Sequence, residues 1–124
     1  MLKTKDPTVL SGLEPDGAVG FDPVRMMETG FCLVSGDDIA FFEDRGDGIV
    51  SGHYFLKSRG RNAISVAESF LSRVFEDYSV VTGLTPVDNK AALWMTRRLG
   101  FQMLDVLETE AGLMQLSMLK KEFK

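Results

Sequence analysis

The sequence predicts one mixed α/β domain, in which a mostly antiparallel central sheet is flanked by helices. Its 124 residues are the length of a single domain. Short β-prone runs bounded by turn-forming residues alternate with two segments whose apolar residues recur every three or four positions. The sequence contains no internal repeat, low-complexity tract or long linker that would divide it. We therefore expect residues 1–124 to form one domain.

The N-terminal part of the chain holds one short apolar run and one short helix. Residues 8–10 suit an edge strand, and a loop rich in Gly and Pro follows them. A helix is expected over residues 23–28, because Asp22 can cap it and Pro23 suits its first position. Gly30 can end this helix. Its residues that are expected to face the core are Val24 and Met27.

The middle of the chain predicts an antiparallel meander. Three β-prone runs cover residues 31–34, 39–43 and 49–56. They are separated by residues 35–38 and 44–48, both rich in turn formers. A calcium loop is the alternative for these acidic turns, but neither has alternating carboxylates that end in Glu at the required spacing. We therefore expect no metal site.

Residues 62–77 give the strongest helix signal, because their apolar residues fall on one stripe. A compact strand is expected over residues 79–84, and Pro86 opposes its continuation. The expected core stripe of the helix comprises Ala63, Val66, Ala67, Phe70, Leu71 and Val74.

The last part of the chain predicts a second helix and a hairpin. Asp88 or Asn89 can cap this helix, and Gly100 can end it after Leu99. Trp94 and Met95 in this helix are expected to be core or interface residues. Residues 102–108 and 113–119 flank a turn and suit a terminal hairpin.

Composition excludes several classes of protein. The chain has 14 basic and 18 acidic residues and a net charge of −4, which opposes unaided binding to nucleic acid. No apolar run approaches the ~20 residues of a membrane-spanning helix, and no secretion signal is present at the start, so we expect a cytoplasmic protein. The lone Cys32 excludes an internal disulfide, and it is expected to be a small buried hydrophobic residue.

One motif resembles the GNAT family of acetyl-coenzyme-A-dependent acyltransferases. In the stretch from Val87 to Phe101, the family's spacing is matched by Asn89, Ala92, Gly100 and Phe101. The resemblance covers residues 39–119 and implies a GNAT-like mixed sheet that binds acetyl-CoA. The alternative is that Asn89 merely caps a helix and that Gly100 and Phe101 merely lead into a strand.

A second stretch resembles the loop in which this family holds the cofactor's pyrophosphate on backbone N–H groups at a helix start. Arg59 to Arg61 fit that pattern, whereas Asn62 and Ile64 replace its two small residues. The basic residues around this loop are equally consistent with solvated charges. The cofactor-binding residues that the resemblance implies are Phe55, Leu56, Lys57, Arg59, Gly60, Arg61, Asn62, Ala63, Asn89, Lys90 and Ala92.

Catalysis by this family needs a base for the amine proton and an acid for the departing thiolate. The family's acidic Tyr corresponds to Thr96, whose hydroxyl is far too weak an acid for that role. His53, the only histidine, is the candidate base, and its alternative is a structural role in the sheet. Glu43 and Asp44 are the other candidate bases. Tyr54 is a candidate acid if its face of the strand lines the cleft.

Two functions follow from the resemblance. The first is an acyl-CoA-dependent N-acyltransferase that uses acetyl-CoA or a related thioester, with an unknown amine or protein acceptor. Because the N-terminal region is short, the acceptor pocket would need a partner protein or a homodimer. The second is a catalytically inactive interaction module, because the chain also resembles small GNAT-like proteins of tailed bacteriophages, including head-assembly and virion proteins. The location would then be the infected host's cytoplasm or the virion.

Overall fold

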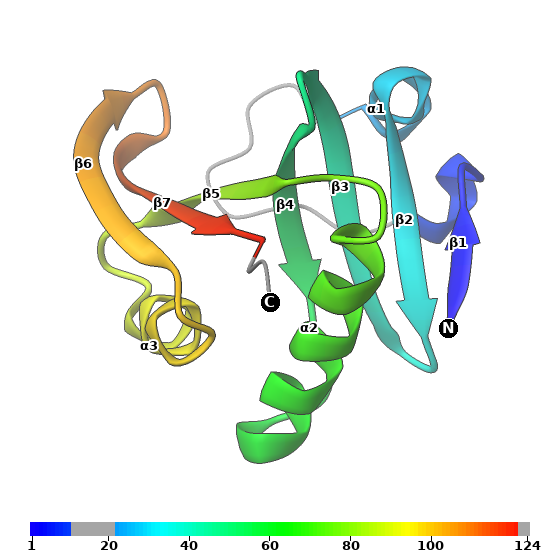
Figure 1. Cartoon of the computed structure of the whole chain (residues 1–124). Coiled ribbons are helices and arrows are strands. Elements are labelled where there is room, and N and C mark those ends of the chain that lie inside the picture. Colours follow the sequence, from blue (N-terminus) through cyan, green and yellow to red (C-terminus); the bar gives the residue numbers. More distant parts are fainter. Residues whose placement is uncertain (11–21, 122–124) are drawn as a thin grey trace.

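The computed structural model describes residues 1–10 and 22–121, and its seven described strands form one sheet in the order β1-β2-β3-β4-β5-β7-β6 (Figure 1). Every neighbouring pair is antiparallel except β4 and β5. This architecture confirms the predicted fold class. The strands are β1 (Leu2–Thr4), β2 (Gly30–Ser35), β3 (Asp38–Gly46), β4 (Ile49–Phe55), β5 (Val80–Pro86), β6 (Gln102–Thr109) and β7 (Gly112–Lys120). The helices are the 3₁₀-helix η1 (Pro7–Leu10) and the α-helices α1 (Pro23–Thr29), α2 (Gly60–Val74) and α3 (Lys90–Arg98).

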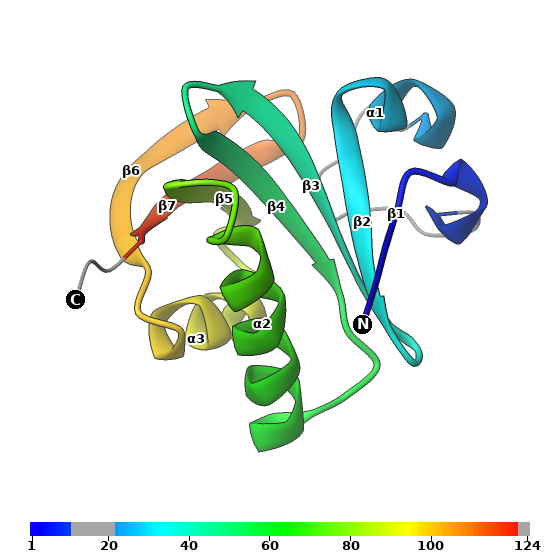
Figure 2. The same ribbon diagram turned by 45° about the vertical axis from the view of Figure 1, so that its right-hand side comes forward.

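Two clusters of buried side chains lie on opposite faces of the sheet. On one face, α2 packs Phe70 and Val74 against Phe42 of β3. On the other face, Met27 of α1 and Leu10 of η1 pack against Phe41 of β3 and Cys32 of β2. Phe41 directly precedes Phe42 in β3. Successive residues of a strand point to opposite faces, so β3 contributes to both clusters. Figure 2 shows α2 and α3 on the same side of the sheet.

The sheet divides at its centre. β4 and β5 run parallel and pair through three residues, Ile49 with Val80, Val50 with Val81 and Ser51 with Thr82. Within the described chain, their pairing stops there, although β4 continues to Phe55 and β5 to Pro86. The two strand ends therefore part and leave backbone groups of both strands without a ladder partner.

Several elements form where the sequence predicts them. The meander, the capped helix α1 and the terminal hairpin are all present. The strand predicted over residues 79–84 forms as β5, but it continues through Pro86, which pairs with Met114 of β7, so Pro86 does not end it as predicted. The Asp22 carboxylate accepts hydrogen bonds from Val24 N at 3.1 Å and from Arg25 N at 3.4 Å, as expected of a helix cap. The stripe of α2 is largely buried. In the part of the chain that the structure describes, no helix is long and apolar enough to span a membrane.

Three further local predictions were wrong. Residues 8–10 form part of η1 rather than an edge strand, because the Asp6 carboxylate accepts from Thr8 N at 2.9 Å and from Thr8 Oγ1 at 2.8 Å and so begins a turn. The edge strand is β1. Val24 is 64% exposed, so Met27 alone of that pair faces the core. Helix α2 covers Gly60–Val74, so it begins two residues before and ends three residues before the predicted range of 62–77.

Candidate functional site

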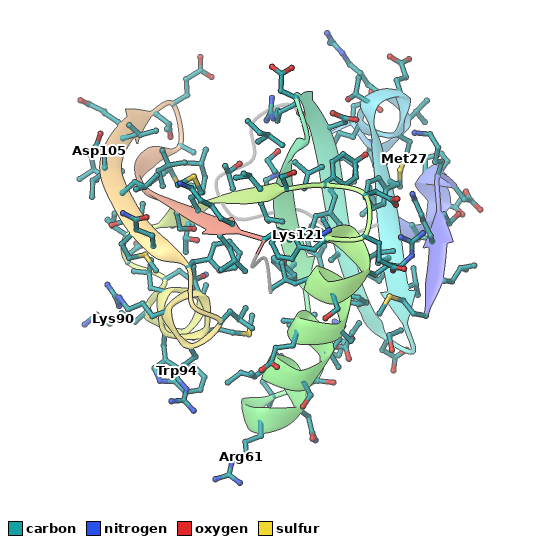
Figure 3. All side chains as sticks on the ribbon, in the orientation of Figure 1. Met27, Arg61, Lys90, Trp94, Asp105 and Lys121 are labelled. Atoms are coloured by element: carbon teal, nitrogen blue, oxygen red, sulfur yellow. The ribbon has the colours of Figure 1, made fainter. Side chains whose placement is uncertain are left out.

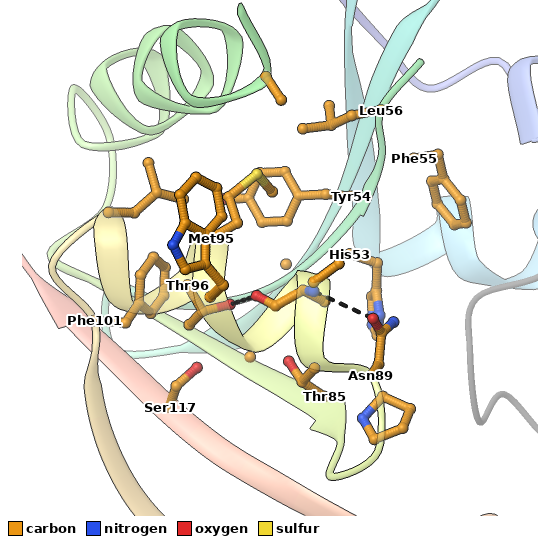
Figure 4. A pocket seen from close by; sticks show the side chains of 18 of the residues that line it. His53, Tyr54, Phe55, Leu56, Thr85, Asn89, Met95, Thr96, Phe101 and Ser117 are labelled. Carbon is orange, nitrogen blue, oxygen red and sulfur yellow. Dashed lines mark hydrogen bonds between the residues drawn. The ribbon is translucent and has the colours of Figure 1, made fainter. Parts of the chain in front are cut away.

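A cavity of about 640 Å³ lies where β4 and β5 part (Figure 4). Its walls are the separated ends of these two strands, the loop and first turn that begin α2, and one side of α3. Ser117 of β7 and Phe101, which follows α3, complete the lining. A cavity of this size at a break in the sheet is a typical place for a small ligand.

The β4 residues at this cavity alternate between the two faces of the sheet. Figure 4 shows Tyr54 and Phe55 pointing in opposite directions. Tyr54 and Leu56 pack with the cluster under α2, and Phe55 packs with the cluster under α1. His53 lies on the same face as Phe55, where its ring stacks on Phe41 with centroids 6.1 Å apart. Because β4 borders the gap, residues of both faces line the cavity.

His53 has an electrostatic setting that keeps its imidazole neutral. Burial lowers the pKa of His53 below its usual 6.5, the Glu43 carboxylate opposes that shift, and the Arg45 guanidinium adds to it. Glu43 is itself paired with Arg45, whose Nη1 lies 3.0 Å from Glu43 Oε1. A neutral imidazole at neutral pH is able to accept a proton.

Two hydroxyls at the cavity are buried without a partner. Among the described residues, neither Tyr54 OH nor Ser117 Oγ has a hydrogen-bonding partner, and both residues line the cavity. Burial raises the pKa of Tyr54, so its phenol stays protonated and is able to donate. Its ring packs edge-on against Phe42 at 5.8 Å. An unpartnered buried hydroxyl costs free energy, which a bound polar group can recover.

The start of α2 offers backbone donors to the cavity. Arg59 is the N-cap residue, and within the described chain no side chain caps this helix. Gly60, the first helical residue, has a φ of +59°. The first N–H groups of a helix have no partner inside it, and the helix dipole adds positive potential at the same end. Gly60 and Ala63 both line the cavity, so this uncapped first turn borders it.

Asp38 organises the loop that leads into α2. Its Oδ1 accepts from Lys57 N at 2.7 Å and Ser58 N at 2.9 Å, and its Oδ2 accepts from Ser58 Oγ at 2.6 Å. These hydrogen bonds, those of Ser58 most strongly, lower the pKa of Asp38. The Arg59 guanidinium folds back and donates to the carbonyl oxygens of Leu56, Lys57 and Ser58 at 2.7, 3.3 and 3.0 Å. Asp38 therefore binds backbone N–H groups of this loop, and Arg59 binds its backbone carbonyl oxygens.

Helix α3 presents the residues of the Asn89 motif. Asn89 caps the helix by accepting from Ala92 N at 3.2 Å, and both residues line the cavity. Thr96 occupies the position of the family's acidic Tyr, and its hydroxyl donates to Ala92 O at 2.8 Å (Figure 4). Thr96 thus uses its only proton within the helix.

The structure brings most of the predicted site residues to one cavity. Five lie elsewhere. Glu43 and Asp44 are on β3, paired with Ser51 and Val50 of β4 outside the lining. Arg61, Asn62 and Lys90 are exposed and also outside the lining. Figure 3 shows Arg61 and Lys90 extending into solvent from α2 and α3. The predicted residues that line the cavity are His53, Tyr54, Phe55, Leu56, Lys57, Arg59, Gly60, Ala63, Asn89 and Ala92.

Sequence reasoning missed three residues at this site. Asp38 looked like an ordinary turn residue, because its partners lie about twenty positions away. Ser117 sits in an apolar strand, where a lone Ser was the available signal. Trp94 was expected in a core or an interface, but it is 51% exposed and lines the cavity. Cys32 is fully buried as predicted, and burial raises the pKa of its thiol to about 12.

No protein-family model and no curated protein sequence matches this chain. Solved structures match its fold. RimJ of Mycobacterium smegmatis in complex with CoA-disulfide gives a TM-score of 0.65 at 11% identity, over 86% of this chain and 68% of that chain. An acetyltransferase of Bacillus subtilis in complex with CoA gives 0.63 at 10% identity, over 79% of this chain and 81% of that chain.

A spermidine N-acetyltransferase chimera of SpeG from Vibrio cholerae and hSSAT gives a TM-score of 0.60 at 11% identity, over 73% of this chain. This chain spans 65% of that neighbour's length. Aminoglycoside acetyltransferase AAC(6')-Ib in complex with coenzyme A gives 0.63 at 13% identity, over 79% of this chain and 70% of that chain. At such identities the likeness establishes the fold, which is that of the GNAT acyltransferases.

Proposed function

We propose that this protein is an acyl-CoA-dependent N-acyltransferase. The observation that carries the proposal is the cavity between the parted ends of β4 and β5, which the uncapped start of α2 borders. Neighbours of the same fold hold CoA in their solved structures, which supports acetyl-CoA or a related thioester as the acyl donor. The acceptor would be an amine, because the fold neighbours include enzymes named for acetylating spermidine and aminoglycosides.

The first turn of α2 would hold the pyrophosphate of the donor. The N–H groups at Gly60 and the following residues are free of side-chain caps among the described residues, and an anion is the ligand that such a helix start prefers. Lys57 lines the same cavity and adds a positive charge beside it. Asp38 keeps the loop in shape by binding backbone N–H groups of Lys57 and Ser58 that lie before the helix.

The parted strands would receive the extended arm of the donor. Beyond Ser51 of β4 and Thr82 of β5, the described chain shows no pairing between these two strands, so their facing backbone groups border the cavity without a partner across the gap. An extended ligand with amide groups can hydrogen-bond to such strand margins as an added strand does. Asn89 and Ala92 would border this arm from α3.

His53 would be the general base. When bound, acetyl-CoA supplies an acyl group activated as a thioester. The neutral imidazole of His53 would accept the proton that the attacking amine must lose. Its position on the cavity wall and its lowered pKa both support this role.

Tyr54 would supply the phenolic hydroxyl that the family places on α3, where this chain has Thr96. Thr96 is too weakly acidic and its proton is already bound to Ala92 O. Tyr54 OH has no partner among the described residues and stays protonated, so it is able to donate a hydrogen bond to a polar atom of the donor. Its raised pKa makes hydrogen bonding a better role than full proton transfer.

Calorimetric titration with CoA and acetyl-CoA tests the binding half of this proposal. We expect salt-sensitive binding that Lys57→Gln weakens, because Lys57 is a cation on the cavity wall. Arg25→Gln is the matched control, because it removes the same charge from α1, outside the cavity. Absence of binding at millimolar CoA would contradict the proposal.

An activity assay tests the chemical half. Release of free thiol from acetyl-CoA would be followed with spermidine, aminoglycosides and protein N-termini as acceptors. The second candidate function is a GNAT-fold module that binds without transferring, as in a phage head-assembly protein. The single observation that favours it is the occupied hydroxyl of Thr96. CoA binding with no turnover on any acceptor would favour that module.

A further inference from the structure

Trp94 is an exposed aromatic side chain at the edge of the cavity. It is 51% exposed although Trp is the chain's largest apolar residue type, and it lines the same cavity as the start of α2. The Arg98 guanidinium lies over its ring, 5.9 Å from the centroid. Such a contact steadies the ring, and the exposed fraction leaves much of its surface uncovered. Nothing in the catalytic proposal uses this side chain.

The surroundings of Trp94 are strongly basic in an otherwise acidic protein. The residues that line this side of the cavity fall in two segments, residues 57–63 around the start of α2 and residues 89–101 around α3. Together they contain six of the chain's 14 basic residues and none of its 18 acidic ones. The six are Lys57, Arg59, Arg61, Lys90, Arg97 and Arg98.

Arg61 of α2 and the indole ring of Trp94 of α3 point toward one edge of the molecule (Figure 3). A flat ring with a free surface suits an aromatic base, since every base has a face that can stack. The concentration of cations suits phosphate groups carried on the same ligand. The two preferences together describe a phosphorylated nucleoside.

We propose that Trp94 is the stacking platform for the adenine ring of the acyl donor, and that the Arg97–Arg98 side of α3 favours its ribose phosphate. This inference rests on the proposed function, because it assigns the nucleotide end of the same CoA ligand. The adenosine 3′,5′-bisphosphate end lies at the outer edge of the cavity, between α2 and α3. The pantetheine arm then runs inward between β4 and β5.

Intrinsic fluorescence tests this assignment directly, because Trp94 is the chain's single tryptophan. Adenosine 3′,5′-bisphosphate and CoA are expected to quench it at saturation, and pantetheine is expected to leave it unchanged. Quenching by pantetheine and none by the nucleotide would overturn the assignment. The nucleotide is used alone so that the test does not depend on the strand gap.

Calorimetric titration with CoA compares the affinity of variants at this position with that of the wild type. Trp94→Ala is expected to weaken binding about 5- to 100-fold, and Trp94→Phe no more than about threefold, because Phe keeps a ring to stack on. Val106→Ala is the matched control, since Val106 is 52% exposed on β6 and outside the cavity. Circular dichroism checks that each variant keeps its fold.

The outcomes separate this inference from the proposed function. If the protein binds CoA and Trp94→Ala binds it equally tightly, the stacking assignment fails and the acyltransferase proposal stands. If adenosine 3′,5′-bisphosphate binds at Trp94 but CoA does not, the acyltransferase proposal fails and the nucleotide site stands. If neither binds, both are wrong.

Discussion

The Asp38 carboxylate holds Ser58 by two hydrogen bonds, from Ser58 N at 2.9 Å and from Ser58 Oγ at 2.6 Å. Asp38 begins β3, and Ser58 lies in the loop that leads into α2. A turn of the meander thus fixes the loop that precedes the candidate anion site. The stability of this loop and its ability to bind a ligand should depend on the same carboxylate.

Asp38→Ala should lower both stability and affinity for CoA. Hydrogen bonds to a charged group contribute about 1.5–3 kcal/mol, so we expect a loss of that size in the free energy of unfolding, measured by urea titration. Asp37→Ala is the control, because Asp37 is exposed and should change stability by less than about 0.5 kcal/mol. Equal effects of the two variants would show that the Asp38 hydrogen bonds do not stabilise the loop.

The contribution of Asp38 should also depend on pH. Its folded-state pKa lies below the ordinary 3.8, so its stabilisation is fully present above that value. The stabilisation is lost as the pH falls below 3.8 through the folded-state pKa. Acid titration should therefore narrow the difference in stability between the wild type and Asp38→Ala. A difference that stays constant down to pH 2 would contradict this assignment.

His53→Asn should slow transfer without weakening CoA binding. Removal of a general base costs about 10²–10⁴-fold in rate, and we expect a loss in this range with an unchanged Kd for CoA. Because burial lowers the pKa of His53, the acid limb of kcat/KM in the wild type should lie below pH 6.5. A variant that keeps both the rate and the acid limb would exclude His53 as the base.

His53 should also make the fold sensitive to mild acid. The folded state favours neutral imidazole, so the unfolded chain takes up this proton first as the pH falls below 6.5. The free energy of unfolding of the wild type should then decrease with falling pH until the folded-state pKa is passed. His53→Asn should lack that component, which urea titrations at pH 7.5 and pH 5 would measure.

Tyr54→Phe should leave stability unchanged or raise it by about 1 kcal/mol, because it removes a buried hydroxyl that has no partner among the described residues. The same change should reduce affinity or turnover if the hydroxyl binds the donor. Tyr78→Phe is the control, because its hydroxyl bonds Asp44 at 3.3 Å away from the cavity. A marked loss of stability in Tyr54→Phe would mean that the hydroxyl is satisfied in the folded protein.

Gly60→Ala should destabilise the start of α2 by about 1 kcal/mol, because Gly60 has a φ of +59° and a Cβ disfavours that conformation. No described atom lies within 4 Å of the added carbon, so the cost would come from the backbone alone. Gly60→Asn should cost less, since Asn adopts positive φ more readily. Equal melting temperatures for the two variants would contradict this explanation.

The fold could be predicted from local signals. Alternation in the meander, the apolar stripe of α2 and the Asn89 cap each depend on residues that are close in sequence. The predictions that were wrong concern short segments in which the sequence signals for the alternatives are of similar strength. Thr8 follows Asp6 and Pro7, which favour a turn over a strand, and Val24 lies on a helix too short for its pattern to define a face.

The site could be predicted in part, because motif residues mark it but distant partners shape it. The Asn89 motif and the loop around Arg59 both contribute residues to the same cavity. The Asp38 contact, the outward side chain of Arg61 and the exposure of Trp94 arise from how α2 and α3 sit on the sheet. The face of β4 that carries His53 follows from the register with Phe41, which the sequence does not specify.

The short seam between β4 and β5 has a mechanical consequence. The sheet consists of two groups of strands, β1 to β4 and β5 with β7 and β6. Among the described residues, three pairs between β4 and β5 join the two groups. Ladder hydrogen bonds resist bending where they exist, and they cover a small part of this joint. A ligand that hydrogen-bonds to the parted ends of both β4 and β5 would restrict motion of the two groups of strands relative to each other. Hydrogen exchange of the backbone amides of β4 and of β5 should then slow together when the ligand binds.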